Sequence, residues 1–115
     1  MARRDVIHDA VKNALIKDGW NITHDPLSIS FGSQRGYVDL GAERFIAAAR
    51  HDEKIAVEIK SFAGRSLITE LEKALGQYLM YRTWLNIKER DRATYLAMDI
   101  EAYQTLFEET FLGAF

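Results

Sequence analysis

The sequence predicts an α/β fold in which a mixed central β-sheet is flanked by helices. Three observations predict it. The chain opens with a segment of helical periodicity, a group of short alternating segments follows up to residue 60, and a long helical segment precedes one more strand. The 115 residues fit one compact domain, residues 1–115. With 48% hydrophobic residues and one proline, the chain can form a true core.

The first expected element is a helix over residues 5–18. Its apolar positions recur at helical spacing at Ile7, Val11, Ala14 and Leu15, and Gly19 ends the pattern. Residues 20–26 are expected to form a turn-rich exit, because Pro26 keeps the residue before it extended. In residues 27–31, Leu27, Ile29 and Phe31 alternate with serines, which predicts a first strand. The "GSQRG" that follows predicts a loop.

Three inner strands are expected next. Residues 37–40 form a short strand that carries Asp39. Residues 44–50 ("RFIAAAR") suit a helix as well as a strand, but "HDEK" and the strand 55–60 after it favour a hairpin. In 55–60 the apolar residues alternate with Ala56, Glu58 and Lys60, so Glu58 and Lys60 point to one face of the sheet.

A long helix is expected from Ser66, as N-cap, to about Lys88. Its predicted sheet-facing stripe comprises Leu67, Leu71, Leu75, Tyr78, Arg82 and Leu85. A strand over 93–98 and a closing helix over about 101–109 follow. When only the three inner strands are counted before the long helix, the order of elements is α-β-β-β-α-β-α.

The long helix has a second apolar side. Gly76, Met80 and Ile87 lie opposite the sheet-facing stripe, and Trp84 lies close by. A glycine inside a helix costs about 1 kcal/mol relative to alanine. A helix that is apolar on two sides needs a second partner, either the closing helix of its own chain or another protomer. We favour another protomer, and hence a homodimer.

The composition excludes several classes of protein. The absence of cysteine excludes a disulfide scaffold, a thiol nucleophile and a zinc–thiolate site, and it agrees with a reducing cytoplasm. No run of apolar residues is long enough for a membrane helix, and the N-terminus lacks the apolar core of an export signal. We therefore expect a cytoplasmic protein with no membrane partner. A net charge of −2 disfavours a tight nonspecific nucleic-acid binder.

Asp39, Glu58 and Lys60 form one group of residues that could act in catalysis. The predicted hairpin brings the Asp39 strand close to the strand of Glu58 and Lys60, and two carboxylates converging with a lysine suit phosphodiester hydrolysis. Asp39 and Glu58 would be ligands for Mg²⁺ (or Mn²⁺), which activates a water and neutralises phosphate charge. Lys60 would orient or deprotonate that water and stabilise the transition state. The alternative is an ordinary surface salt bridge between Glu58 and Lys60.

The segments "VDL" and "AVEIKSF", followed by a helix, resemble the PD-(D/E)XK nuclease superfamily, whose core has the order αβββαβ of a restriction endonuclease. Four longer stretches together resemble the XisH family, the fdxN element excision controlling factor proteins of cyanobacteria: "RDVIHDAVKNALIKDGWNITHDPL", "DLGAERFIAA", "KIAVEIKSF" and "ALGQYLMYR". This second resemblance covers nearly the whole chain.

The resemblance implies an accessory factor for a site-specific recombinase that excises a DNA element during heterocyst differentiation. Many of these nucleases take an acidic residue from the first helix, but here Asp5 and Asp9 point away from the apolar stripe. His8, at its edge, is the polar residue best placed to reach the site, as a metal ligand or to orient a water. Gln77, on the flank of the long helix, corresponds to a polar residue that supports such sites.

Three hypotheses follow. The first is a metal-dependent endonuclease acting in or beside recombination. The second is a catalytically silent nuclease fold that regulates by binding DNA, a recombinase or another excision controlling factor. The third is a small structural subunit whose Glu58–Lys60 pair is only a salt bridge. An intact set of Asp39, Glu58 and Lys60 favours the first; the mildly acidic chain and His8 in place of a first-helix acid favour the second.

Overall fold

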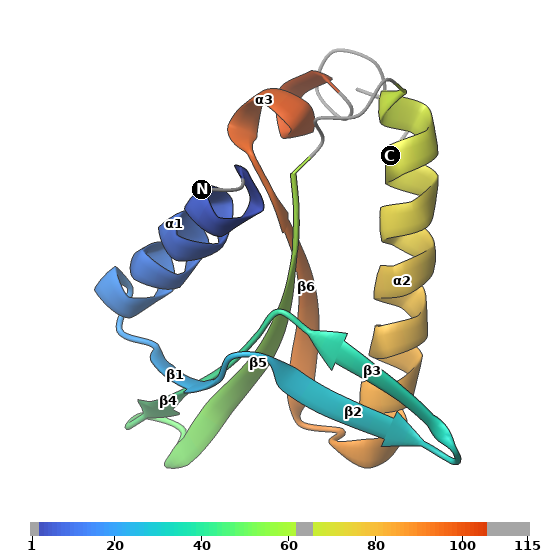
Figure 1. Cartoon of the computed structure of the whole chain (residues 1–115). Helices are drawn as coiled ribbons and strands as arrows, with labels where there is room; N and C mark the ends of the chain where they lie inside the picture. The colour runs from blue at the N-terminus through green and yellow to red at the C-terminus, as the bar shows by residue number, and fades with distance from the viewer. Residues whose placement is uncertain (1–2, 62–65, 106–115) are drawn as a thin grey trace.

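The computed structural model describes residues 3–61 and 66–105, with side chains from residue 6 onward (Figure 1). In chain order its elements are α1 (Arg3–Lys17), β1 (Asn21–His24), β2 (Leu27–Phe31), β3 (Gln34–Val38), β4 (Leu40–Ile46), β5 (His51–Lys60), α2 (Leu67–Lys88), β6 (Arg92–Met98) and α3 (Ile100–Tyr103). None of the described helices is both long and apolar enough to cross a membrane.

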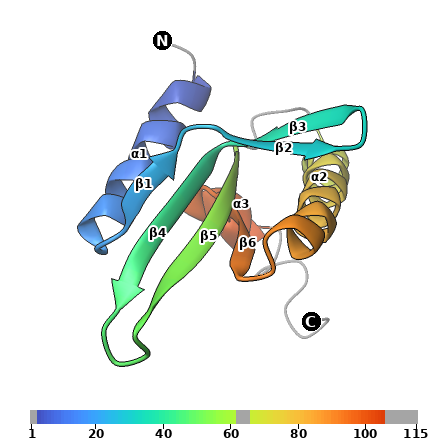
Figure 2. The same cartoon turned by 90° about the horizontal axis from the view of Figure 1, so that it is seen from below.

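The predicted fold class is confirmed, since a mixed sheet lies between helices. The strand order is β1-β4-β5-β6, with β1, β4 and β5 antiparallel and β6 parallel to β5. The helix α2 lies in the connection between the parallel pair β5 and β6, as parallel pairing requires a crossover. A separate hairpin, β2–β3, lies beside this sheet (Figure 2).

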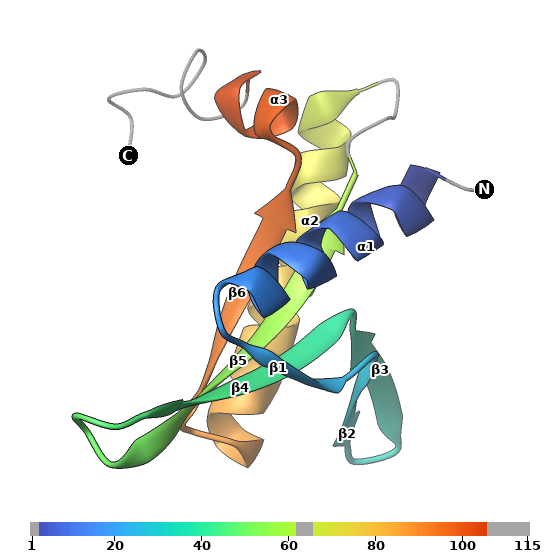
Figure 3. The ribbon, with the colours of Figure 1, turned by 90° about the vertical axis from the view of Figure 1, so that its left-hand side faces the viewer.

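The alternation along β5 divides the core into two layers. Ile55, Val57 and Ile59 pack with Trp20 and Leu40 beneath α1, which lies in front of the sheet in Figure 3. Ala56 points to the opposite face, where α2 and the β2–β3 hairpin cover it. Because side chains alternate across a strand, Glu58 and Lys60 share the α2 side with Ala56.

The hairpin packs closely on the C-terminal half of α2. Phe31 stacks on Trp84 with ring centroids 5.4 Å apart. A Cβ added to Gly36 would lie 2.7 Å from Cε1 of Tyr81, whose ring is buried. Only a glycine therefore lets β3 approach the helix this closely.

Several strand boundaries differ from the predicted ones. Residues 21–24 form β1 rather than a turn, and 34–36 of the expected loop belong to β3. The predicted strand 37–40 is split, because Tyr37 and Val38 end β3 whereas Leu40 begins β4. The predicted strand 44–50 is also displaced: β4 ends at Ile46, and 47–50 form the turn of the predicted hairpin with β5. Pairing with another strand overrides the local pattern at 21–24, which pairs with β4, and at 34–36, which pairs with the adjacent β2.

The inner face of α2 is rotated relative to the prediction. Ser66 is its N-cap, as predicted, and its side chain accepts a hydrogen bond from the amide of Thr69. The buried residues are Leu71, Ala74, Tyr81 and Leu85, whereas Leu75 and Arg82 are exposed. Trp84, expected on the outer side, packs against the hairpin instead. The hairpin draws Tyr81 and Trp84 inward. Of the predicted closing helix, about 101–109, residues 101–103 are helical within α3, and 106–109 lie outside the described residues.

The glycines of the hairpin and of α2 give a matched test of this packing. We expect Gly36→Ala to lower the free energy of unfolding by about 1–3 kcal/mol, because the buried Tyr81 ring cannot move aside. The control Gly76→Ala meets no atom within 4 Å and should stabilise α2 by up to about 1 kcal/mol. Urea denaturation in dilute solution measures both, and an unchanged Gly36→Ala midpoint would contradict the packing.

Candidate active site

Asp39 stands at the junction between β3 and β4, where it exchanges two hydrogen bonds with β5. Its backbone amide donates to Oε1 of Glu58 at 3.3 Å, and its Oδ2 accepts from the amide of Ile59 at 2.8 Å. The regular ladder between β4 and β5 ends at the pair Leu40–Val57. The two side chains therefore replace one further step of backbone pairing, and this places the two carboxyl groups side by side.

Lys60 completes the group of three residues. Its Nζ lies 3.9 Å from Oε2 of Glu58. Glu58 is only 3% exposed and Asp39 is 9% exposed, whereas Lys60 is half-buried. The structure thus brings Asp39, Glu58 and Lys60 together, with the acids inside and the ammonium group nearer to solvent. A buried carboxyl pair of this kind differs from an exposed salt bridge.

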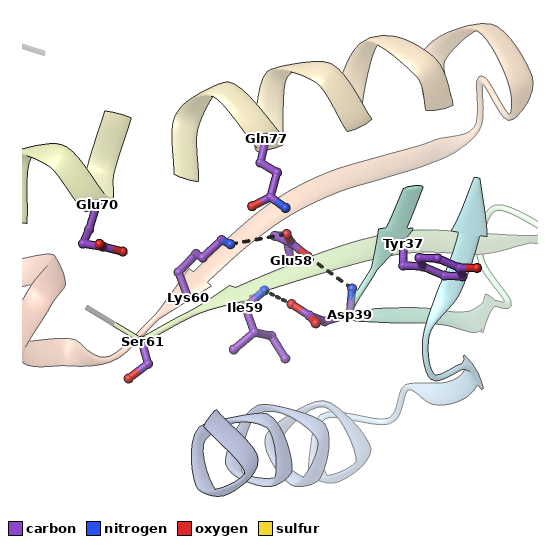
Figure 4. Close-up of a pocket in the computed structure, with 8 residues that line it drawn as sticks. All are labelled: Tyr37, Asp39, Glu58, Ile59, Lys60, Ser61, Glu70 and Gln77. Carbon is purple, nitrogen blue, oxygen red and sulfur yellow. Dashed lines mark hydrogen bonds and ion pairs between the residues drawn. The ribbon is translucent and has the colours of Figure 1, made fainter. Parts of the chain in front are cut away.

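These residues line a cavity of about 330 Å³ between β5 and α2. Figure 4 shows the side chains of Glu58, Lys60 and Gln77 directed toward one another across it, with Asp39 and Tyr37 on the β3 side. The full lining is Tyr37, Asp39, Glu58, Ile59, Lys60, Ser61, Glu70 and Gln77. The cavity is open to solvent and lined mostly by polar groups, which suits a charged ligand.

The pKa of Glu58 is raised to about 7. The largest cause is burial, which disfavours the charged carboxylate, and the neighbouring Asp39 carboxyl raises the pKa further. Lys60 and the amide of Asp39 lower it only in part. Near neutral pH Glu58 is therefore poised between its protonated and its ionised form.

The donor set fits a hard divalent cation. Two carboxylates that repel each other would both be ionised beside a bound cation, and Mg²⁺ commonly binds through one or two carboxylates while it keeps several waters. Within the described part of the chain, no three side chains of His, Cys, Asp or Glu come together as a metal cluster. A cation held by Asp39 and Glu58 alone would keep several waters.

His8 is not brought to this cavity. Its Nε2 lies 2.9 Å from Oδ1 of Asp25, whose other oxygen accepts a hydrogen bond from Lys12 at 2.8 Å. The hydrogen bond from Lys12 is the main cause that lowers the pKa of Asp25. His8 therefore does not line the cavity, contrary to the expectation that it is best placed to reach the site. The reason is that Asp25, which follows β1, binds His8 and Lys12 of α1 and so connects this helix to the β1–β2 connection.

Gln77 does reach the cavity, and its Nε2 donates to the hydroxyl of Tyr81 at 3.4 Å. Three further polar residues line the cavity that were not predicted from the sequence: Tyr37, Ser61 and Glu70. A signal for Glu70 existed, since it lies seven residues before Gln77 and so shares its face of α2. No comparable signal existed for Tyr37, whose place depends on how β3 leaves the sheet.

Comparisons with known proteins agree on one family. A family model described as "XisH protein" matches residues 1–115. The crystal structure of an XisH family protein from Nostoc punctiforme is 45% identical, with a TM-score of 0.80 over 92% of this chain and 78% of that chain. That of an fdxN element excision controlling factor protein from Anabaena variabilis is 46% identical, with a TM-score of 0.80 over 93% and 78%. No curated protein matches.

The raised pKa of Glu58 predicts how stability depends on pH in the presence of a chelator. The folded chain holds this proton more tightly than the unfolded chain, so the stabilisation is complete below the ordinary pKa of 4.5 and is lost as pH rises through about 7. We expect the free energy of unfolding to fall by up to about 3 kcal/mol between about pH 5 and pH 8. Urea denaturation across this range measures it.

Glu58→Gln removes the titrating group and should abolish that loss, while the control Glu72→Gln, an exposed acid on α2, should retain it. Equal pH slopes for Glu58→Gln and the wild type would show that the carboxyl is not the group responsible.

Proposed function

Because this chain belongs to the XisH family, that of the fdxN element excision controlling factor proteins, we propose that it acts on DNA as an accessory to the site-specific excision of a DNA element. Its chemistry in this role is that of a Mg²⁺- or Mn²⁺-dependent endonuclease-like domain. Its partners are DNA and a recombinase or another excision controlling factor.

A single observation carries the proposal of endonuclease chemistry. Asp39 and Glu58 are buried side by side, with Lys60 3.9 Å from Glu58, at the floor of an open polar cavity. Burying two neighbouring carboxyl groups is unfavourable for folding, because one of them must take up a proton unless a cation is present. A chain with no use for a cation would be more stable with apolar residues at these positions.

Each residue has a defined task in phosphodiester hydrolysis. Asp39 and Glu58 would hold the cation, which when bound lowers the pKa of a water and neutralises charge on the phosphate oxygens. Lys60 reaches into the solvent-accessible part of the cavity, where it can orient the attacking water and stabilise the charge that develops on phosphorus oxygens. The water oxygen bonds to phosphorus as the bond to the leaving sugar oxygen breaks.

A second candidate is a catalytically silent regulator that binds DNA or a recombination partner through the same fold. One observation favours it: α1 contributes none of the described cavity lining, and its polar residue His8 is bound to Asp25. The site then lacks the first-helix group that the resemblance to nucleases led us to expect. Metal binding and cleavage separate the two candidates.

Calorimetric titration with Mg²⁺ or Mn²⁺ tests the first step. We expect millimolar or tighter binding that strengthens from about pH 6 to pH 8, as Glu58 loses its proton. Glu58→Gln should weaken it by about tenfold or more, because one ligand charge is removed. Lys60→Ala should leave it intact, since the ammonium group is not a ligand.

Incubation with supercoiled plasmid tests the second step. We expect Lys60→Ala to reduce cleavage by about a hundredfold or more, whereas the exposed Lys73→Ala on α2 should match the wild type. If no divalent cation binds at millimolar concentration and every variant behaves as the wild type in each DNA assay, the endonuclease proposal fails and the regulator remains.

A further inference from the structure

A second polar cavity, of about 500 Å³, lies between the C-terminal half of α2 and β6. We call it the arginine cavity. It shares no lining residue with the cavity around Glu58. The connection from α2 to β6, at the lower end of both elements in Figure 1, contributes Arg90 and Asp91 to its lining. Because β6 is an edge strand of the four-stranded sheet, no other strand of the described chain covers its outer side.

Two guanidinium groups in the lining have no partner within the described chain. Arg82 and Arg90 are both exposed, and neither makes a hydrogen bond or an ion pair there. Asp91, the acid among the described lining residues, is itself engaged, since its Oδ2 lies 3.6 Å from Nζ of Lys54. An anion in the arginine cavity would therefore meet two positive charges that no carboxylate neutralises.

The fold gives Arg82 no structural task. Cations in the last turn of a helix offset its dipole, but Arg82 lies more than one turn before the end of α2 at Lys88. Arg90 lies just beyond the C-cap, where Lys88 already supplies a cation. By contrast, the neighbouring Arg92 is buried and donates to the carbonyl of Ile55 at 2.9 Å. Arg92 serves the fold, whereas Arg82 and Arg90 remain available to a ligand.

Neutral polar groups complete the lining. Asn86 follows Arg82 by four residues, so both lie on one face of α2, and Tyr95 of β6 is 54% exposed. The hydroxyl of Tyr78 donates to the carbonyl of Thr94 at 3.2 Å and so holds the helix to the edge strand. Oγ1 of Thr94 is buried without a hydrogen-bond partner in the described chain. Since buried hydroxyl groups normally have one, a ligand or a water that it carries is a suitable partner.

This combination of groups suits a phosphate. The planar guanidinium group binds two phosphate oxygens at once, and neutral side-chain donors commonly complete such contacts. The chain also needs a site of this kind if it is to hold DNA. Its net charge is −2, and Asp39, Glu58 and Glu70 line the other cavity, where they repel a phosphodiester that has no cation beside it.

We propose that the arginine cavity binds a phosphate group of the DNA backbone, with Arg82 and Arg90 as the ionic contacts and Asn86 as a neutral donor. The choice of DNA rests on the proposed function, whereas the choice of a phosphate rests on the lining alone. The cavity is a binding site and takes no part in the cleavage step.

The register of the sheet places the two cavities near each other. Thr94 pairs with Ala56, which lies two residues before Glu58 on β5. From the spacing and rise of strands, the backbones of Thr94 and Glu58 are about 8 Å apart. Glu70 and Gln77 lie on one side of the buried stripe of α2, and Arg82 and Asn86 lie on the other. DNA that contacts both cavities would therefore cross this helix.

Fluorescence anisotropy with a labelled duplex tests the proposal in EDTA, which keeps divalent cations away from Asp39 and Glu58. We expect the wild type to bind with a dissociation constant on the order of 1–100 μM at about 50 mM salt. Arg82→Ala combined with Arg90→Ala should weaken binding about tenfold or more. The salt dependence should fall by about two phosphate contacts.

The matched control is Lys17→Ala combined with Arg35→Ala, which changes the net charge equally. Both residues are exposed and line neither cavity, so DNA affinity should stay within about twofold of the wild type. Circular dichroism should show both double variants folded, because all four side chains are exposed. Calorimetry should show that the Arg82/Arg90 variant binds Mg²⁺ or Mn²⁺ as the wild type does.

Calorimetric titration with pyrophosphate at constant ionic strength separates DNA from a free phosphate ligand. We expect no binding tighter than about 1 mM, because a small anion meets only one set of contacts. Micromolar binding that the Arg82/Arg90 variant loses, with unchanged DNA affinity, would assign the cavity to a free phosphate compound and overturn the choice of DNA.

Two further results would overturn the proposal: an Arg82/Arg90 variant that binds the duplex as tightly as the wild type, or a control variant that weakens binding equally. Either result leaves metal binding and cleavage at Glu58 untouched. A wild type that binds no DNA under any of these conditions contradicts the proposed function as well, so the two failures are distinguishable.

Discussion

The exchange of hydrogen bonds between Asp39 and β5 is the constraint on which most of this structure depends. Its Oδ2 accepts a hydrogen bond from the amide of Ile59, and its own amide donates to the side chain of Glu58. The backbone pairing of β4 with β5 therefore extends from Ile46 only as far as Leu40. The chain before Asp39 is thereby released from the sheet and forms the β2–β3 hairpin, which packs on α2. One residue thus ends a strand pairing, directs a hairpin and positions the carboxyl pair.

The burial of two neighbouring carboxyl groups lowers the stability of the fold at the candidate site. A buried Glu58 beside Asp39 keeps its proton up to about pH 7, and Lys60 compensates only in part. An apolar pair would pack there without this electrostatic penalty. The rest of the sheet supplies the necessary rigidity, because Ile55, Val57 and Ile59 of the same strand are buried beneath α1. The strand therefore contributes to the core on one face and to the candidate site on the other.

The helix α2 contributes to two parts of the structure at once. Its N-terminal half contributes Glu70 and Gln77 to the cavity, and its C-terminal half receives the hairpin on Tyr81 and Trp84.

The features that depend on short-range periodicity could be predicted from the sequence. The alternation along β5 places Glu58 and Lys60 on one face, the helical spacing and the cap at Ser66 define α2, and the hairpin of β4 and β5 brings Asp39 near Glu58. These follow from covalent geometry, which a local pattern reveals. Contacts in the folded chain settle which side of α2 is buried, that β1 and β3 are strands, that His8 binds Asp25, and that Tyr37 and Glu70 line the cavity. These features depend on contacts between segments, some adjacent, as β2 and β3 are, and some distant, as α1 and Asp25 are. The periodicity within one segment does not record them.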